Sequence, residues 1–598
     1  MLKGLYDATR VDDFADEANK YMLDLARLIF AFELGKDLPE NPVQARQSMP
    51  LSSAFVDAVI ENLCTVETPD LSKAAAQTKA VMEVLISRRT VDAAGVSARL
   101  DAATSLLHQM GSRLASHCYD PSWQRKTGAA RGMSLLISDV GVETKWIIEH
   151  EIEFTRALLF ALKDMPGEAP SNADMVVDTL LHLVRVCSKT TTPEEKQASR
   201  TTLNYLVGLL LVEVSSQVAP VRDAVKRALK IVSEEEGKSL TEMLTPVKDR
   251  LLGPIFTKPL RALGFTMQIG HIDAVTYCIT LDPPLIEVDD QLVRLLHEAL
   301  GIADAEDVAL LGGKITSKTT APLTQLRVVC VQLLSAALAN PQLNTPPYNQ
   351  TRIRALSVYF KLLYSKAPEV VDAAYQSLKQ VMLAQGKLPK DLLQTGLKPV
   401  LMNLADHKKL SVASLHVRPP FSSRSTTCTS LARSSRARSR STMLTPLGPR
   451  PPPPRAQGLA RLLELLTNYF KVEIGQKLVD HFRSLAVPAD ILRATAKQPS
   501  EDGELEVMAA ITNIFHLLPH PAAGQYLDDV IEMVVQVERL LKKLKTSIFT
   551  PPLAKFLALH PEKATMFFFG RLAEERYVPT FRAVLASEHA QPIRDWIE

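Results

Sequence analysis

Apolar residues recur along almost the whole chain at the three- and four-residue spacing that places them on one face of a helix. The pattern is clear in Pro220–Val232, Gln291–Leu300 and Leu459–Phe470. No alternation of period two lasts long enough to predict a sheet. The sequence therefore predicts an all-α fold. In Gln291–Leu300 the apolar face consists of Leu292, Leu295, Leu296 and Leu300.

The helical segments follow one another as pairs joined by short breaks. Leu206–Val214 is followed by a break with Pro220 and a second helix, and Arg352–Leu363 by Ala367-Pro368 and the helix Val370–Leu383. Such a hairpin buries its apolar face only by stacking on the next hairpin. We therefore expect an α-solenoid of stacked antiparallel helical hairpins, a HEAT-like superhelix. Leu326–Leu338 is apolar nearly all round, which predicts a helix of the inner layer that is covered on several sides.

Composition fits a folded chain without a membrane span. The chain has 598 residues, of which 46% are hydrophobic and 23% charged, a balance that argues against wholesale disorder. The opening stretch Met1–Lys20 is mixed and charged, unlike a signal peptide. The longest apolar run, Leu203–Val214, falls short of the roughly 20 residues that span a bilayer. It predicts a buried helix instead.

One interval, residues 416–456, breaks the helical pattern. It contains eight arginines, no lysine and no acidic residue, so the rest of the chain carries a formal charge of about −5 although the whole chain carries +3. Whole-chain charge is thus no argument for nucleic-acid binding. We interpret the interval as in-frame retained intron sequence or an error in the gene model. The alternative is an Arg/Ser arm that is phosphorylated, directs nuclear import or binds RNA. Either origin predicts disorder, with helical repeats over 1–415 and 457–598 on its two sides.

No pattern of residues predicts catalysis or metal binding. Gly312-Gly313-Lys314 hints at a phosphate loop, but a Walker A loop needs Gly where Val308 stands and Ser or Thr where Ile315 stands. Glycine-rich, His-Arg-Asp and Asp-Phe-Gly kinase motifs are missing from the sequence. We therefore predict no catalytic, cofactor-binding or metal-binding residue, no cofactor and no small-molecule substrate.

Several isolated residues suggest sites but have simpler explanations. His150-Glu151 and His297-Glu298 begin like zinc-protease helices but lack the second histidine, so we expect ordinary residues of the helix surface. Two acidic groups predict helix N-caps and solvated turns. Six dispersed cysteines predict buried thiols in a reducing compartment. The run Met566–Phe569 favours core over interface. The acidic groups are Asp289-Asp290 and Asp304, Glu306, Asp307; the cysteines are Cys64, Cys118, Cys187, Cys278, Cys330 and Cys428.

Five long strings resemble, in order, the helical-repeat region of the TRRAP family, the giant transcription-associated pseudokinase scaffolds, and in particular its fungal members. The first is LSSAFVDAVI, which begins at Leu51. KPLRALGFTMQIGHIDAVTYC begins at Lys258 and LDPPLIEVDDQLVRLLHEALGIADAED at Leu281. QGLARLLELLTNYFKVEIGQKL begins at Gln457, and SIFTPPLAKFLALHPEKATMFFF at Ser547. The likeness covers nearly the whole chain except 416–456.

The resemblance implies a non-catalytic HEAT scaffold in SAGA- and NuA-type histone acetyltransferase complexes, located in the nucleus. Such a scaffold links transcriptional activators and acetyltransferase-complex subunits, with no sequence-specific binding of nucleic acid and no membrane contact. Two alternatives stay open: a HEAT segment of an active PI3-kinase-related kinase, and a karyopherin-like transport solenoid that binds a small GTPase and cargo.

Overall fold

The computed structural model describes residues 2–11, 13–34, 44, 47–66, 70–90, 96–165, 170–189, 193–311, 317–363, 365, 367–385, 473–486, 504–518, 523–541 and 547–598. These residues form helices, turns and connecting segments, without a β-strand among them. The all-α prediction is therefore confirmed. The chain divides into two compact units, Met1–Glu287 and Val288–Glu598.

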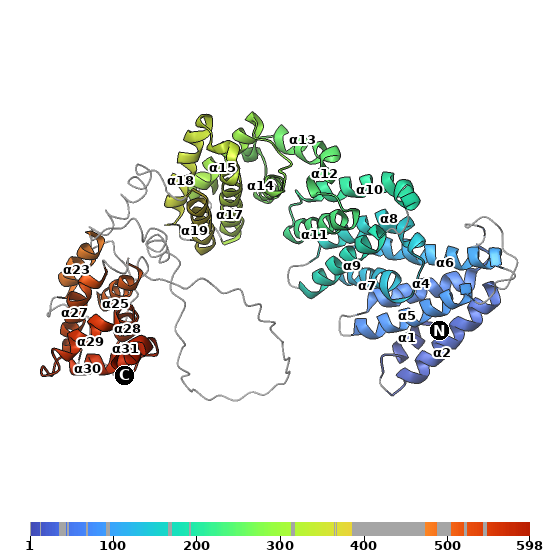
Figure 1. Cartoon of the computed structure of the whole chain (residues 1–598). Coiled ribbons are helices and arrows are strands. Elements are labelled where there is room, and N and C mark those ends of the chain that lie inside the picture. Colours follow the sequence, from blue (N-terminus) through green and yellow to red (C-terminus); the bar gives the residue numbers. More distant parts are fainter. Residues whose placement is uncertain are drawn as a thin grey trace. The chain divides into compact units, whose positions relative to one another are not determined.

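The first unit is a succession of helices that pair and stack (Figure 1). The helices α6 and α7, α8 and α9, and α10 and α11 form consecutive hairpins, and α7, α9 and α11 pack on one another as a layer. This is the stacked-hairpin arrangement that the sequence predicts. The elements are α1 (Leu2–Ala8), α2 (Ala15–Leu34), α4 (Pro50–Thr65), α5 (Leu71–Thr90), α6 (Val96–His117), α7 (Trp123–Ser134), the π-helical turn η2 (Leu135–Asp139), α8 (Thr144–Lys163), α9 (Pro170–Ser188), α10 (Pro193–Glu213), α11 (Ala219–Glu236), α12 (Leu240–Leu244), η3 (Thr245–Val247), α13 (Asp249–Thr257), η4 (Leu260–Ala262) and α14 (Phe265–Thr280).

Helix α11 shows how local sequence sets the ends of an element. Pro220 lies in the first turn, where its missing N–H leaves no hydrogen bond unmade. Gly237 follows the last turn with φ 67°, a left-handed conformation that glycine adopts without steric cost. Its N–H donates to the Glu234 carbonyl at 3.3 Å. The apolar face predicted for 220–232 is fully buried: Val221, Ala224, Val225, Ala228, Leu229 and Val232.

The start of α4 is capped by a side chain from another helix. Glu33, in the last turn of α2, is 1% exposed, and its carboxylate accepts hydrogen bonds from the backbone N–H groups of Leu51 (3.1 Å) and Ser52 (2.7 Å). An acidic group suits this position because the first N–H groups of a helix have no partner within the helix. Glu33 therefore fixes α2 against α4.

Helices α4 and α7 approach each other closely at a glycine. A Cβ atom on Gly128 would lie 2.4 Å from the Leu63 carbonyl oxygen and 2.7 Å from the Cys64 Cα. Backbone atoms of α4 thus occupy the space that any side chain at position 128 would need. The glycine permits this close packing of the two helices.

The second unit begins with the helices α15 to α19. Asp289 caps α15, since its carboxylate accepts from the Leu292 N–H at 2.8 Å, and the predicted face Leu292, Leu295, Leu296 and Leu300 is buried. The predicted hairpin of residues 352–383 corresponds to α18 and α19, which pack together. The elements are α15 (Asp290–Asp304), α16 (Asp307–Leu311), α17 (Ser317–Ala339), η5 (Pro341–Asn344), η6 (Pro346–Tyr348), α18 (Asn349–Leu362) and α19 (Pro368–Gln385).

Helix α17 is the inner helix of this group. It packs against α15 on one side and α19 on another, as the apolar run Leu326–Leu338 predicts (Figure 1). Its stretch Thr319–Ala339 is the one helix in the described ranges that is long and apolar enough to cross a membrane, and 50% of that stretch is buried within the fold. Helices in the core of a folded domain have this composition as well.

The end of the chain forms a further group of short helices around aromatic side chains. Phe515, Phe556 and Phe568 are fully buried there. In the run Met566–Phe569, Phe567 and Phe568 are buried, whereas Met566 is 61% and Phe569 49% exposed, so the predicted core role holds for two of the four. The elements are α23 (Glu473–Leu485), α25 (Glu504–Ile514), η9 (Phe515–Leu517), η10 (Gly524–Tyr526), α27 (Leu527–Leu540), α28 (Thr550–Leu557), α29 (Pro561–Phe569), α30 (Val578–Leu585), η11 (Glu588–Ala590) and α31 (Gln591–Ile597).

Three expectations lie outside the described residues: the helix Leu459–Phe470, the glycine pair before Lys314, and the disordered interval 416–456.

Candidate functional site

The part of the chain that the structure describes has no cluster of three or more His, Cys, Asp or Glu residues able to hold a metal ion. Its cysteines are unpaired and buried, and burial raises the pKa of each thiol, to about 12 for Cys118 and Cys278. A thiol with a raised pKa is a poor nucleophile. The prediction of small apolar core residues is confirmed for Cys64, Cys118, Cys187, Cys278 and Cys330, while Cys428 lies outside the described residues.

The expectation that His150 and Glu151 lie on a helix surface is wrong. They are 6% and 5% exposed, because α8 is covered by α6, α7, α9 and α11 on more than one side. His150 stacks on Trp146 with ring centres 4.0 Å apart and lies 2.9 Å from His108, Nε2 to Nδ1. His297 is exposed as predicted, with Nε2 2.9 Å from the Thr351 hydroxyl oxygen.

The acidic pairs serve structure. Besides the Asp289 cap, Asp304 accepts from the Lys361 ammonium at 2.6 Å, and Asp307 from the Arg327 guanidinium at 2.5 Å. Both carboxylates are part-exposed. Asp304 is the last residue of α15, where the helix dipole favours a cation such as Lys361, and Asp307 is the first residue of α16. Asp304 thus ties α18 to the end of α15, and Asp307 ties α17 to the start of α16.

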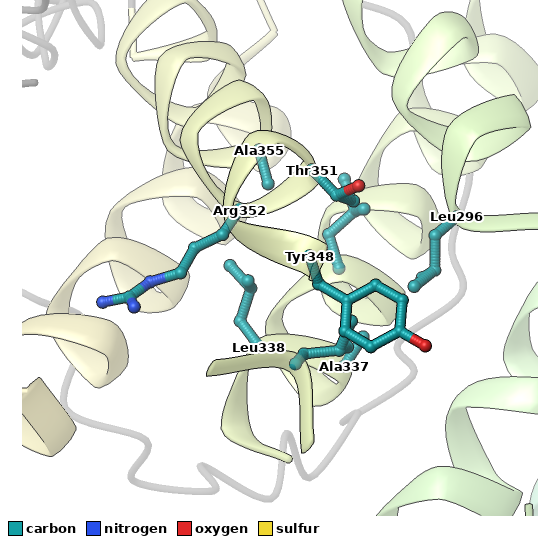
Figure 2. Close-up of a pocket in the computed structure, with 9 residues that line it drawn as sticks. Leu296, Ala337, Leu338, Tyr348, Thr351, Arg352 and Ala355 are labelled. Atoms are coloured by element: carbon teal, nitrogen blue, oxygen red, sulfur yellow. The ribbon is translucent and has the colours of Figure 1, made fainter. Parts of the chain in front are cut away.

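Figure 2 shows the hollow between α15, α17 and α18. Leu296, Ala337 and Leu338 line it, Tyr348 lies at its edge, and the Arg352 guanidinium extends away from the apolar residues. Its volume of about 10 Å³ corresponds to a single water molecule, far below the roughly 300 Å³ at which small-molecule sites begin. The hollow is a packing defect between helices.

Two larger hollows are open and mixed in charge. One, of about 370 Å³, lies between α4 and α6, where Asp57 pairs with Arg113 at 3.1 Å. The other, of about 620 Å³, lies between α27 and α30, where Glu538 accepts hydrogen bonds from Ser547 and Thr580. Carboxylates and basic groups are interspersed in the linings of both hollows.

One surface of the first unit has a row of aromatic and arginine side chains across the helices α8 and α10. We call Tyr119, Arg156, Phe160, Tyr205 and Val212 the α8–α10 surface. Its four uncharged members are each between 41% and 49% exposed. Tyr119 packs on Phe160 with ring centres 4.8 Å apart, and the Arg156 guanidinium donates a hydrogen bond to the Tyr205 hydroxyl.

The composition and rigidity of the α8–α10 surface suit protein binding. Tyr and Arg are the types that dominate the energetic centres of interfaces. Here their contacts with each other hold the side chains in place before any partner arrives, which lowers the entropy lost on binding. The Arg156 guanidinium lies 5.4 Å from the centre of the Tyr205 ring, and the Lys126 ammonium 5.3 Å from that of Phe160, so cations support both rings.

Gly208 on α10 makes room for an arginine of α13 beside this surface. A Cβ on Gly208 would lie 2.6 Å from the Arg250 Nη1, so the glycine leaves room for the Arg250 side chain to lie against α10 one turn from Tyr205. The sequence predicts Leu203–Val214 as a buried helix. Leu206, Val207, Leu210 and Leu211 are buried, but Tyr205 and Val212 face outward. The only signal for the outward face is the polar Asn204 and Glu213 near its ends.

Comparison with known proteins places these features in a family. The sequence model of the family described as "Tra1 HEAT repeat ring region" matches residues 1–417 and 454–598. The chain is 34% identical over 467 residues to the "SAGA complex/NuA4 acetyltransferase complex subunit TRA1" of Saccharomyces cerevisiae, covering 78% of this chain and 11% of the relative. It is 32% identical over 483 residues to the "SAGA complex/NuA4 acetyltransferase complex subunit Tra1" of Schizosaccharomyces pombe, covering 80% and 12%.

The similarity to more distant relatives and to solved structures is weaker. The human "Transformation/transcription domain-associated protein" is 26% identical over 515 residues, covering 81% of this chain and 12% of the relative. The chain thus spans about an eighth of the length of these relatives. The solved structure of Kap121p bound to Ste12p has 11% identity and a TM-score of 0.40, covering 99% of this chain and 55% of that one. A likeness of that strength carries no functional argument.

Proposed function

The chain belongs to the Tra1 HEAT repeat ring family, and from that premise we propose that it is a non-catalytic helical scaffold segment in a subunit of SAGA- and NuA4-type histone acetyltransferase complexes. The observation that carries the proposal is the match of the family model to nearly all of the chain outside 418–453. The matching family is that of a HEAT ring and not of a kinase domain. An extended array of hairpins fits such a role because it presents long surfaces to several partners.

The partners that we propose are proteins: transcriptional activators and other subunits of the acetyltransferase complexes, met in the nucleus. The α8–α10 surface is the contact region that we assign to one of them. It is pre-ordered, part-exposed and built from the residue types that anchor protein interfaces. We propose no sequence-specific binding of nucleic acid, no membrane contact and no small-molecule substrate.

Affinity capture tests the proposal. The tagged chain is expressed in its own cells, captured from nuclear extract and analysed by mass spectrometry, and the captured material is assayed for acetylation of histones. We expect acetyltransferase-complex subunits and histone acetylation together. Captured material with no acetyltransferase-complex subunits and no histone acetylation would contradict the scaffold proposal. Recovery of a small GTPase whose binding depends on its nucleotide would support the transport solenoid instead.

A surface variant then tests the assigned contact region. The double variant Arg156→Ala/Tyr205→Ala removes the hydrogen-bonded pair at the centre of the α8–α10 surface. The matched control is Arg294→Ala, an exposed arginine on α15. We expect the double variant alone to lose at least one captured subunit, roughly tenfold or more for an anchor residue of an interface. Equal capture by both variants would contradict the assignment and show that the partner binds another surface.

We propose helical repeats over 1–415 and 457–598, separated by an interval 416–456 that derives from retained intron sequence. The gap in the family match over 418–453 supports this division. Sequencing of the mature transcript tests it. Transcripts that join codon 415 directly to codon 457 are expected, and transcripts that routinely contain the interval would favour the Arg/Ser arm.

A further inference from the structure

Helix α2 carries apolar side chains on two adjoining faces. Its inner face packs on α1, α4, α5 and α6 and includes Ala18, Met22 and Phe30, which are at most 5% exposed. Beside this face runs an exposed row that we call the α2 seam, which consists of Phe14, Tyr21, Leu28 and Phe32. The four side chains are 60%, 68%, 68% and 62% exposed, in that order, and such a group of large apolar residues in water is unusual. The neighbours of α2 in the first unit therefore cover only part of its apolar surface (Figure 1).

The spacing of the α2 seam is that of a coiled-coil surface. Phe14, Tyr21 and Leu28 are seven residues apart, at the d positions of a heptad. The a positions, four residues after each of these, are Ala18, Leu25 and Phe32. Phe14 lies on the helical path of α2, since its carbonyl oxygen accepts from the Ala18 N–H at 2.9 Å. Side chains at a and d positions form one strip along a partner helix, here over about 27 Å.

The exposed area of the α2 seam fits one helix better than a second copy of the chain. At 60–68% exposure, four side chains of roughly 200 Å² each leave about 500 Å² in water. A stable interface between two globular proteins buries about 800 Å² on each partner. The seam falls short of that area, whereas a single helix of about 18 residues covers its whole length.

The edge of the α2 seam is acidic. Glu17 and Asp24 lie at g positions, where charged side chains pair with those of a partner helix. Glu17 is exposed, and the Asp24 carboxylate accepts from the Arg27 guanidinium at 2.9 Å. An exposed pair of this kind contributes little to stability, so Asp24 can exchange Arg27 for a cation of the partner. Two antiparallel copies of α2 would bring the carboxylates of both copies together, which is unfavourable, whereas a helix with lysine or arginine at the matching positions is favoured.

We propose that the α2 seam is the docking site of one amphipathic helix from another protein, with large apolar residues at heptad spacing and lysine or arginine along one edge. Such a helix would cover the four exposed side chains and pair with the two carboxylates at once. That the helix comes from another protein rests on the proposed function, in which protein subunits are the partners of the array. The recognition of the helix does not rest on it, because it follows from the spacing, exposure and charge of α2.

A labelled synthetic peptide tests recognition by the full chain. The probe is an amphipathic helix of about 20 residues with leucine at its a and d positions and lysine along one edge, and the control peptide has glutamate in place of the lysines. Fluorescence anisotropy is expected to show roughly threefold or tighter binding of the lysine peptide, because it gains two exposed ion pairs. The double variant Glu17→Lys/Asp24→Lys is expected to prefer the glutamate peptide. No binding of the lysine peptide, or an unchanged preference in this variant, overturns the proposal.

A second pair of variants tests the apolar contacts. Tyr21→Ser/Leu28→Ser removes the two most exposed side chains of the α2 seam and should lower the affinity for the lysine peptide roughly tenfold or more. Circular dichroism checks that this variant keeps its helices. Leu383→Ser replaces a leucine on α19 that is 76% exposed, so it is the matched control and should bind as the wild type. Equal binding by the wild type and both variants overturns the proposal.

Photo-crosslinking in the protein's own cells identifies the source of the helix. The photoreactive residue p-benzoylphenylalanine replaces Leu28, and the crosslinked peptides are sequenced by mass spectrometry. A crosslink to an amphipathic segment of another protein with lysine or arginine along one edge is expected. A crosslink to a second copy of the chain, or to another segment of the same polypeptide, overturns the docking of a separate protein. Peptide binding by a chain that captures no acetyltransferase-complex subunit would contradict the proposed function and support recognition by the α2 seam.

Discussion

Substitution of Gly128 by alanine tests the close packing of α7 on α4. The added Cβ would lie 2.4 Å from the Leu63 carbonyl oxygen, a backbone atom that cannot move away by changing a side-chain rotamer. Ordinary contacts of this kind are about 3.4 Å. Helix α7 must therefore shift from α4 by about 1 Å, which weakens dispersion contacts along the whole interface.

The expected size of the effect follows from two opposing contributions. Overpacking of a tight interface costs about 1–3 kcal/mol. Alanine is a better helix former than glycine by about 1 kcal/mol, which offsets part of that cost. The difference is about 0–2 kcal/mol, and we expect Gly128→Ala to lower the free energy of unfolding of the first unit by an amount in this range. Gly4→Ala in α1 is the control, because a Cβ there meets nothing within 4 Å and only the helix preference applies.

Urea unfolding followed by tryptophan fluorescence measures the difference. The chain has three tryptophans, Trp123, Trp146 and Trp596, so a Trp596→Phe background leaves the two reporters that lie in the first unit. We expect a lower unfolding midpoint for Gly128→Ala with an unchanged slope, and an equal or higher midpoint for Gly4→Ala. Equal midpoints in the two variants would refute the close contact at position 128.

Three further predictions concern capping, a buried charge and thiol reactivity. Asp289→Ala should destabilise α15 by about 1 kcal/mol through loss of the N-cap, measured by hydrogen exchange, whereas Asp289→Asn should lose far less. The Lys126 side chain is 1% exposed and that of its partner Asp164 is 63% exposed. Asp164→Ala should lower the free energy of unfolding by about 1–3 kcal/mol, because it leaves a buried ammonium unpaired, whereas Lys126→Met should change it by less than about 1 kcal/mol. Urea denaturation measures both variants, and a larger loss for Lys126→Met would contradict the prediction. Iodoacetamide should alkylate Cys118 and Cys278 only after denaturation, because burial raises the pKa of both thiols to about 12, and rapid native labelling seen by mass spectrometry would contradict the packing.

The sequence predicts those helices whose ends carry their own signals. Helix α11 begins at Ala219 and α15 at Asp290, each one residue before the predicted segment, whereas both helices end four residues beyond it. The apolar faces predicted for both helices are confirmed as buried, because a helix with one apolar stripe has a single way to bury it. The stacked-hairpin architecture follows from the same spacing.

The features that the sequence does not predict depend on contacts between residues far apart in the chain. His150 and Glu151 are polar, but α8 is covered on several sides and buries them. In contrast, Tyr205 is exposed although it lies in an apolar run. Which side of such a helix meets a neighbour is decided by stacking and not by the helix itself. The Glu33 cap of α4 likewise joins positions 18 and 19 residues apart, beyond the reach of a local capping motif.

The distribution of the Gly128→Ala effect separates a solenoid from a globular domain. In a solenoid each hairpin depends on its neighbours, so stability is lost locally. Helix α7 packs on α4, α6, α8 and α9, and these helices should lose protection from hydrogen exchange, while α15, α17 and α19 of the second unit keep it. Because α8 carries part of the α8–α10 surface, the same variant should weaken a partner bound there without touching it. Uniform loss of protection across both units would instead show a single cooperative fold and contradict the solenoid.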